Sequence, residues 1–365
     1  MTAMSAGAVH LVHSALDELN ELHESGDFDG YRIGFALDLW VSRLGDLHAT
    51  RLNIGRMMRC LLYSPAWARI LGASLRLVTN RSRVVRIPTL AGGLMPTSWM
   101  SRMAVSELST YRWSFEEDVL RYKEHGFQAI GVWRPKLSDC GEDKGRELLV
   151  EQQMKVSSVN WAGGFTGSDG RTFRESIHDA LDAIDVAAQL EADCLVVLAG
   201  SRSGHTRNHA KRLLAQALKV LAEAAQAVGI QLAVEPMHIG CAHDFTFLTS
   251  VPDTLDVISA IGRSNCGIVF DSYHMAQDLN AMDWLPSIVP FIRLVQLGDA
   301  KRAPIGEQNR CLLGEGKVPL AALVKTIEQY GYEGYYEVEL LGEDVEHYDY
   351  SEILSQSFHT VAGYR

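Results

Sequence analysis

Short apolar runs alternate with segments of helical periodicity along residues 104–365. Eight runs have the length and β-branched content of strands, and they begin at Val105, Ala129, Val156, Cys194, Gln231, Gly267, Ile292 and Tyr335. Helical stretches separate them, for example 173–190, where Ile177, Leu181, Ile184 and Ala188 recur on one helix face. Eight such units in about 260 residues predict a (β/α)8 TIM barrel.

A doubly wound open sheet is the alternative fold. No G-x-G-x-x-G pattern follows the first predicted strand, so a dinucleotide-binding fold gains no support. Two helix boundaries agree with the barrel pattern. Ser114 and Glu117 form a capping-box pattern, and Gly331 is placed to end the helix expected over 320–330.

Residues 1–103 differ from the rest and form a predicted Arg-rich N-terminal extension. They contain eleven Arg, no Lys and eight acids, and from 47 to 102 there are nine Arg and no acid. A Gly/Pro-rich run over 88–96 marks a boundary before the barrel at 104. The extension is either a basic arm that contacts a surface or a partner, or a segment with no fold of its own.

The composition narrows the class of protein. With 365 residues, a net charge of −11 and 47% hydrophobic residues, the chain is typical of a globular protein. The acidic balance argues against a nucleic-acid partner, and no apolar run is long enough to predict a membrane span. The six cysteines are scattered without a C-x-x-C pair, and no secretory signal pattern is present, so we expect a reducing, cytoplasmic location.

Oxygen-bearing side chains stand where the last four predicted strands end. Glu235, Asp271 and Gln296 end strands five, six and seven, and strand eight carries Glu337 and Glu339. Several carboxylates in one barrel mouth repel each other unless a cation compensates them. Either glutamate of strand eight could be a ligand, and Glu339 is preferred because it lies nearer the mouth. The set Glu235, Asp271, Gln296 and Glu339 predicts one Mn²⁺ or Mg²⁺ ion.

Candidate catalytic and binding residues surround this set. His238, three residues past Glu235, is the preferred base because imidazole titrates near neutral pH. A ligand glutamate, Glu235 or Glu339, could take the proton instead. Trp133 and Trp161 follow strands two and three and could stack on a sugar ring or an aromatic group.

Five segments carry a family resemblance: AVEPMH, FDSYH, LVQLGDAKR, LLGEGKVPL and GYEGYYEVELLGE. Residues 104–365 resemble the xylose isomerase-like barrel superfamily of sugar phosphate isomerases and epimerases. The resemblance implies proton abstraction beside the carbonyl of a keto-sugar or hydroxy-ketone. It also implies the same four metal ligands, with His274 and Arg302 contacting substrate. Gln296 stands where His is commonest, and Cys241 stands where ketose epimerases often have Glu.

Two other functions stay open. EPMH together with Gln296 also resembles the catalytic subunits of C-glycoside deglycosidases, lyases that act on 3-oxo-glycosides with a small β-rich partner subunit. A barrel that has lost its metal and serves as a partner-binding subunit is the non-enzymatic alternative, which Gln296 keeps open. A homo-oligomer is compatible with all three.

Overall fold

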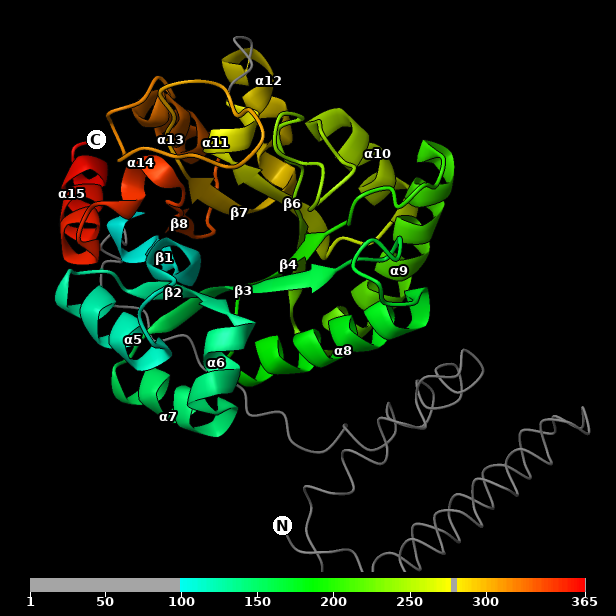
Figure 1. Cartoon of the computed structure of the whole chain (residues 1–365), viewed down its shortest axis with the longest axis horizontal. Helices are drawn as coiled ribbons and strands as arrows, with labels where there is room; N and C mark the ends of the chain where they lie inside the picture. The colour runs from blue at the N-terminus through cyan, green and yellow to red at the C-terminus, as the bar shows by residue number, and fades with distance from the viewer. Residues whose placement is uncertain (1–98, 277–280, 365) are drawn as a thin grey trace, which may run out of the picture. The chain divides into compact units, whose positions relative to one another are not determined.

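The computed structural model describes residues 99–276 and 281–364, so residues 1–98 of the extension predicted over 1–103 lie outside the described residues. Figure 1 shows a closed ring of parallel strands with helices outside it. Each strand pairs with its neighbours in sequence, and β8 pairs with β1 to close the barrel. The fold predicted from the alternating pattern, a (β/α)8 barrel, is therefore confirmed.

The strands are short and almost wholly buried. They are β1 (Met103–Ser106), β2 (Ala129–Trp133), β3 (Lys155–Gly163), β4 (Cys194–Leu198), β5 (Gln231–Val234), β6 (Cys266–Asp271), β7 (Ile292–Leu297) and β8 (Tyr336–Val338). Both faces of each strand are covered, the inner one by other strands and the outer one by helices, which accounts for their continuous apolar character.

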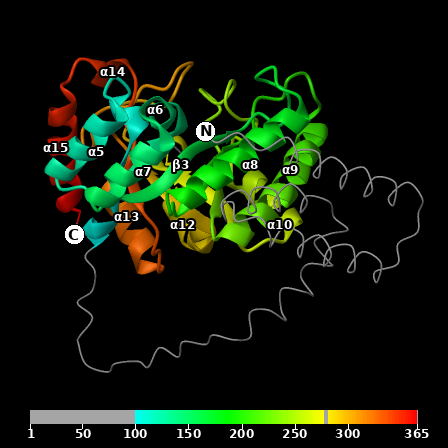
Figure 2. The same ribbon diagram turned by 90° about the horizontal axis from the view of Figure 1, so that it is seen from below.

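The helices connect successive strands on the outside of the barrel. They are α5 (Phe115–Glu124), α6 (Arg134–Cys140), α7 (Glu142–Glu151), α8 (Phe173–Gln189), α9 (Arg207–Val228), α10 (Val251–Ile261), α11 (Ser272–Met275), α12 (Ala281–Ile288), α13 (Leu320–Gln329), α14 (Glu343–Glu346) and α15 (Tyr350–Ala362). Figure 2 shows α8 and α9 side by side, and their buried faces supply much of the core outside the strands. None of the helices in the described part of the chain is long and apolar enough to cross a membrane.

Local sequence signals fix several helix ends. Ser114 accepts a hydrogen bond from the Glu117 N–H, and the Glu117 side chain accepts one from the Ser114 N–H, so the predicted capping box at the start of α5 is confirmed. Thr172 and Glu175 cap α8 in the same way. Gly331 has a φ of 83° just past α13, the left-handed conformation that favours glycine.

Three predicted positions need correction. Trp133 is the last residue of β2 and does not follow this strand. β3 runs on to Gly163, so Trp161 lies inside this strand and does not follow it. β8 ends at Val338, which places Glu339 just beyond the strand, at the mouth.

Candidate metal centre in the barrel mouth

The barrel brings the predicted oxygen-bearing residues to one end. Glu235 directly follows β5, Asp271 ends β6, Gln296 lies in β7 and Glu339 follows β8. Asp271 pairs in register with Gln296, and Gln296 pairs with Glu337 of β8. All five side chains are buried, so their charges and hydrogen bonds must be met within the protein.

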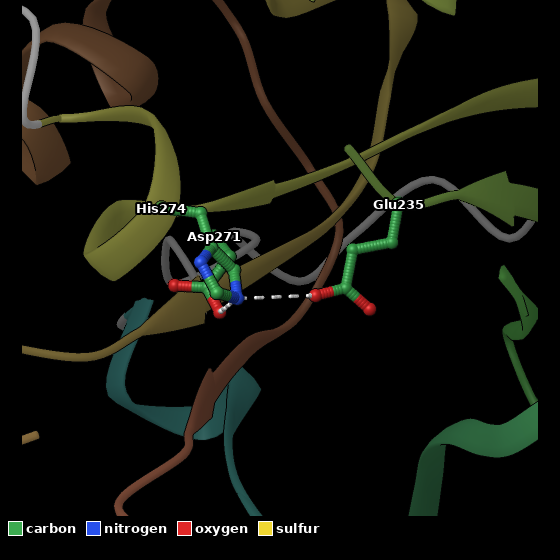
Figure 3. A group of neighbouring side chains, drawn as sticks. All are labelled: Glu235, Asp271 and His274. Atoms are coloured by element: carbon green, nitrogen blue, oxygen red, sulfur yellow. Dashed lines mark ion pairs between the residues drawn. The ribbon is translucent and has the colours of Figure 1, made fainter. Parts of the chain in front are cut away.

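Glu235, Asp271 and His274 form a compact group that could hold a metal ion. One potential ligand atom from each lies within 4.8 Å of the others. His274 Nε2 is 3.9 Å from a Glu235 oxygen and 3.8 Å from Asp271 Oδ2. Figure 3 shows the three side chains pointing toward one another, Glu235 from β5 and the other two from the end of β6 and from α11.

His274 is held as a neutral imidazole. Burial lowers its pKa to about 3, and the nearby Asp271 charge only partly opposes that shift. Its Nδ1 lies 3.6 Å from Cys241 Sγ, while its buried Nε2 has no hydrogen-bond partner among the described residues. Because a neutral imidazole nitrogen is a metal ligand, the unpartnered Nε2 suits a cation between Glu235 and Asp271.

The carboxyl groups of the mouth resist ionisation together. Burial, followed by the charges of Glu339 and Asp271, raises the pKa of Glu235 well above its ordinary value. Burial likewise raises the pKa of Glu339 to about 7, although Arg310 opposes the shift. The pKa of Glu337 is also raised by burial. Such a group of acids is stabilised by added positive charge.

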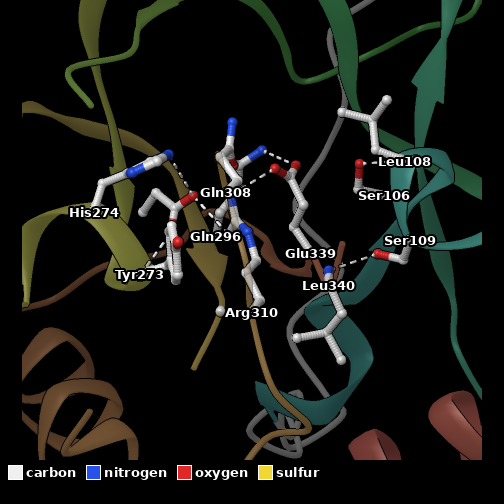
Figure 4. A network of polar contacts seen from close by, with 12 residues as sticks. Ser106, Leu108, Ser109, Tyr273, His274, Gln296, Gln308, Arg310, Glu339 and Leu340 are labelled. Carbon is white, nitrogen blue, oxygen red and sulfur yellow. Dashed lines mark hydrogen bonds and ion pairs between the residues drawn. The ribbon is translucent and has the colours of Figure 1, made fainter. Parts of the chain in front are cut away.

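Arg310 supplies a positive charge that the sequence pattern did not reveal. Its Nη1 donates to Asp271 Oδ2 at 2.9 Å, and its Nη2 donates to Glu339 Oε1 at 3.0 Å. The guanidinium carbon lies 4.6 Å from the centre of the Tyr273 ring, and Nη2 also donates to Gln308 at 2.9 Å. Figure 4 shows Arg310 between the Tyr273 side of the mouth and Glu339.

Gln296 connects Glu337 of β8 with Glu339, which directly follows this strand. Its Nε2 donates to Glu339 Oε2 at 2.7 Å and lies 3.4 Å from Glu337 Oε1. Glu337 Oε2 accepts bonds from Ser157 and Ser158 of β3, deeper in the barrel. Both glutamates therefore face the interior, as the alternation of strand residues predicts. Gln296 Oε1 is buried without a hydrogen-bond partner among the described residues.

Asp299 shapes the loop that carries Arg310. Its Oδ2 accepts the N–H groups of Gly314 and Gly316, and its Oδ1 accepts that of Val318. A Cβ added at Gly316 would lie 2.0 Å from Asp299 Oδ1, so only glycine allows this approach. The Arg310 N–H donates to Leu341 O at 3.0 Å, which ties the loop to the segment after β8.

Three observations indicate that the residues of the mouth fit a divalent cation. His274 Nε2 and Gln296 Oε1 are buried lone-pair atoms without partners in the described residues. The Glu235 carboxylate accepts no hydrogen bond from any described residue, and its contact with His274 is 3.9 Å long. Among the described residues of the mouth, four buried acids face one guanidinium, and added positive charge would favour the ionised forms of these acids.

His238 lies on the loop after β5. Its Nδ1 accepts a hydrogen bond from the Gly240 N–H at 3.0 Å. A neutral imidazole that accepts at Nδ1 carries its proton on Nε2, so this ring is arranged to donate a hydrogen bond at Nε2. Partial burial lowers its pKa, which keeps the ring neutral. The role of His238 as the base, expected from the sequence, stays a prediction. This hydrogen bond does not favour it, because it leaves the proton on Nε2.

A cavity of about 820 Å³ adjoins the histidines His238 and His274. Apolar side chains from α10, α11, α12 and the loop after β5 line much of it, among them Ile239, Val251, Leu255, Met275, Trp284 and Ile288. The cavity offers room for a group larger than a sugar ring and of apolar character.

The other predicted binding residues lie around the mouth. Trp133, the last residue of β2, is half-buried, and its backbone N–H donates to Glu107 Oε2 at 2.7 Å. Trp161 packs against Met237 and neighbouring apolar side chains. Arg302 is exposed on the loop after β7. The substrate contacts of all three stay predictions.

Two residues of the mouth escaped the sequence analysis. Glu107 follows β1 and is fully buried, so the same attention to strand ends would have singled it out. Arg310 lies thirteen residues past the end of β7, in a loop without repeating pattern, directly before the CLLGEGKVPL segment. No pattern in the chain indicates that this arginine returns to the strand ends.

Comparison with known proteins agrees with the fold. The model of the xylose isomerase-like TIM barrel family matches residues 119–356. An inosose isomerase of Bacillus velezensis is 23% identical over 239 residues, which cover 62% of this chain and 83% of the relative. The solved structure of an IOLI protein with a bound zinc atom superposes with a TM-score of 0.63 at 19% identity, covering 72% of this chain and 97% of the other. The apo structure of 3-keto-D-glucoside 4-epimerase from E. coli superposes with a TM-score of 0.60 at 16% identity, covering 72% and 98%.

Proposed function

Because the chain belongs to the xylose isomerase-like TIM barrel family, we propose that it is a metal-dependent sugar isomerase or epimerase. In this proposal the enzyme removes and returns a proton beside the carbonyl of a keto-sugar or hydroxy-ketone. The similarity to an inosose isomerase supports this reaction class. The observation that carries the proposal is the buried Glu235 carboxylate, which lies beside Asp271 and His274 and accepts no hydrogen bond from the described residues.

In this proposal Glu235, Asp271 and His274 hold the metal ion. Two carboxylates and one imidazole suit Mn²⁺, and the nitrogen ligand makes Mg²⁺ the less favoured ion. When bound, a divalent ion polarises a substrate carbonyl and stabilises negative charge on its oxygen.

Glu235 is the base in this proposal. Burial and the neighbouring charges raise its pKa, and a more basic carboxylate is a better acceptor for a proton from the carbon beside a carbonyl. Glu339 is less suited, because Arg310 and Gln296 already donate to both of its oxygens. His238 donates from Nε2 to a substrate oxygen, consistent with the Gly240 N–H at its Nδ1.

The test is solvent-deuterium exchange, followed by NMR, into inososes, ketoses and 3-oxo-glycosides with Mn²⁺ present. We expect exchange at the carbon beside the carbonyl, and Glu235→Gln should slow it by about 10²–10⁴-fold, the contribution of a positioned base. Glu307→Gln, an exposed glutamate on the loop after β7, is the matched control and should exchange normally. If His238→Gln abolishes exchange while Glu235→Gln retains it, the base is His238 and this assignment is wrong.

The apolar cavity favours a second candidate function. A 3-oxo-glycoside with an aromatic aglycone would place a large apolar group beside His238, where Leu255 and Trp284 line the cavity. Proton loss beside the carbonyl would then expel the aglycone from the β carbon, which is elimination. The same exchange experiment separates the two functions, because the lyase releases free aglycone and the isomerase releases none. A barrel that binds no metal and exchanges no proton in any substrate of the panel would support the non-enzymatic alternative.

A further inference from the structure

The Glu337 side chain crosses the interior of the barrel below the mouth. Its carboxyl group is fully buried, and its Oε2 accepts hydrogen bonds from the hydroxyl groups of Ser157 at 2.6 Å and Ser158 at 2.8 Å. Both serines belong to β3, which two strands separate from β8 around the barrel. A Cβ added at Gly131 of β2 would clash with the same carboxyl group, so glycine leaves room for it. The position of this acid is therefore set by strands of the barrel and does not depend on a metal ion.

A β-bulge in β3 turns both serines toward this carboxyl group. Neighbouring residues of a regular strand point to opposite faces of the sheet. The pairing of β2 with β3 shifts between the pairs Ile130–Val156 and Gly131–Ser158, so Ser157 is the extra residue of the bulge. Bulges re-aim side chains in this way and are frequent beside functional sites. Here the bulge directs two adjacent hydroxyl groups to one oxygen of the carboxyl group and leaves the other oxygen for a third donor.

The third donor is the side-chain amide of Gln296, which pairs in register with Glu337. The amide nitrogen lies 3.4 Å from Glu337 Oε1 and donates to Glu339 Oε2 at 2.7 Å. An amide turned by 180° would place its oxygen against these two carboxyl groups, so the hydrogen bonds fix which end is nitrogen. In this orientation Gln296 Oε1 is buried without a hydrogen-bond partner among the described residues. The acids of β8 and its end thus leave a free oxygen on the opposite side of the amide.

We propose that Glu337 is a positioning residue that fixes the Gln296 amide with its oxygen free to face the metal ion. This inference rests on the proposed metal site. Glu339 also faces the amide nitrogen, but it lies at the mouth and is itself a predicted ligand, so its contact with Gln296 changes if it turns to the ion. Glu337 is tied to β3 and holds the amide with or without an ion. Groups that orient a metal ligand in this way contribute about 10–100-fold to metal affinity.

Two other roles for Glu337 predict a different result. As a ligand it would contact the ion directly, and as a bare negative charge it would attract any cation in the mouth. Neither role acts through Gln296, so the loss of Glu337 would weaken metal binding whether or not the amide is present. A positioning role requires the amide, and a double-mutant cycle on the two residues therefore separates it from the others.

The experiment measures the Mn²⁺ affinity of the full chain after treatment with EDTA, with free Mn²⁺ followed by electron paramagnetic resonance. Glu337→Gln should weaken binding about tenfold, and Gln296→Met, which removes the amide at nearly constant length, should weaken it at least as much. Glu337→Gln in the Gln296→Met background should change Kd by less than about threefold, because no amide is left to orient. Equal weakening by Glu337→Gln in both backgrounds, or no weakening in the wild-type background, would overturn the inference.

A second comparison keeps Glu337 and removes the hydroxyl groups that hold it. The double variant Ser157→Ala, Ser158→Ala preserves the charge but frees the carboxyl group, so Mn²⁺ binding should weaken by about tenfold as well. Ser109→Ala removes a buried hydroxyl that donates to the backbone of β8, and this matched control should keep Kd within about threefold. Unchanged affinity in the double variant would contradict the inference. If Glu337→Gln does not fold, or the cycle cannot be completed because a variant binds no ion, this comparison decides the question alone.

Failure of this inference is distinguishable from failure of the proposed function. If the wild-type protein binds no Mn²⁺, the metal-dependent function and the inference fall together. If it binds Mn²⁺ and the effects of the two substitutions simply add, the function stands and the inference falls. If the cycle couples Glu337 to Gln296 but no substrate of the panel exchanges deuterium, the inference stands and the proposed reaction falls.

Discussion

A buried ion pair beneath the first two β/α loops gives a quantitative test of the packing. Lys136 of α6 donates from Nζ to Asp118 Oδ2 of α5 at 2.5 Å, and also to the carbonyl oxygens of Thr110 and Glu107 at 2.9 and 3.3 Å. The two side chains are 7% and 0% exposed. Burial raises the pKa of Asp118, and the ammonium group of Lys136 opposes that rise.

Replacement of Lys136 by Met removes the charge at nearly constant size. Asp118 then keeps the Thr110 hydroxyl at 2.6 Å but loses its cation. Breaking a buried pair in this way costs about 3–5 kcal/mol of the free energy of unfolding. For a domain of this size, about 2–4 °C of Tm per kcal/mol gives a fall of roughly 6–20 °C. Thermal unfolding followed by circular dichroism measures it.

The chain offers a matched control on the adjoining helices. Lys144 of α7 meets Glu116 of α5 at the same 2.5 Å, but the lysine is 65% exposed. Lys144→Met should leave Tm nearly unchanged, because solvent screens an exposed pair. Adding Asp118→Asn to Lys136→Met should recover most of the lost stability, since the uncompensated charge is gone. Equal costs for the two lysine variants would refute the reasoning from burial.

Two further predictions concern the mouth. Because burial raises the pKa of Glu339 to about 7, its contribution to stability is fully present below about pH 4.5 and is lost as pH rises through about 7. Denaturant unfolding of the metal-free protein should therefore show a smaller fall in the free energy of unfolding over this pH window in Glu339→Gln than in the wild-type protein. An equal fall in both proteins would contradict the raised pKa. Gly316→Ala places a Cβ 2.0 Å from Asp299 Oδ1 and should cost about 1–3 kcal/mol by overpacking. The loss is measured by Tm against Gly363→Ala, at φ −79°, where the added Cβ comes no closer than 3.3 Å to another atom.

The residues at the strand ends could be predicted from the sequence because the barrel imposes a simple geometry. Parallel strands of similar length end at one mouth, so a polar residue at each strand end lies near the others. Glu235, Asp271, Gln296 and Glu339 were found in this way. Trp161 was misplaced by the same rule, because β3 is nine residues long and the rule assumes strands of ordinary length.

The loop after β7 could not be predicted, because hydrogen bonds between distant residues set its course. Asp299 gathers the N–H groups of Gly314, Gly316 and Val318, and this fold of the loop brings Arg310 back to the mouth. Neither the hydrophobic periodicity of the sequence nor the spacing of residues at strand ends predicts these hydrogen bonds.

The buried acids of the mouth predict a nearby positive charge, but the sequence does not show whether a metal ion or a side chain supplies it. Four buried acids at the end of a barrel need positive charge, and either an ion or a side chain meets that need. Arg310 supplies one charge between Asp271 and Glu339, and Glu235 is left without a donor from the described residues. The number of buried acids therefore does not give the number of metal ligands, because a side chain meets part of the demand for positive charge. In the proposed site Glu235, Asp271 and His274 carry the remaining demand, so substitutions at Glu235 and Glu339 test whether an ion or the guanidinium compensates each glutamate.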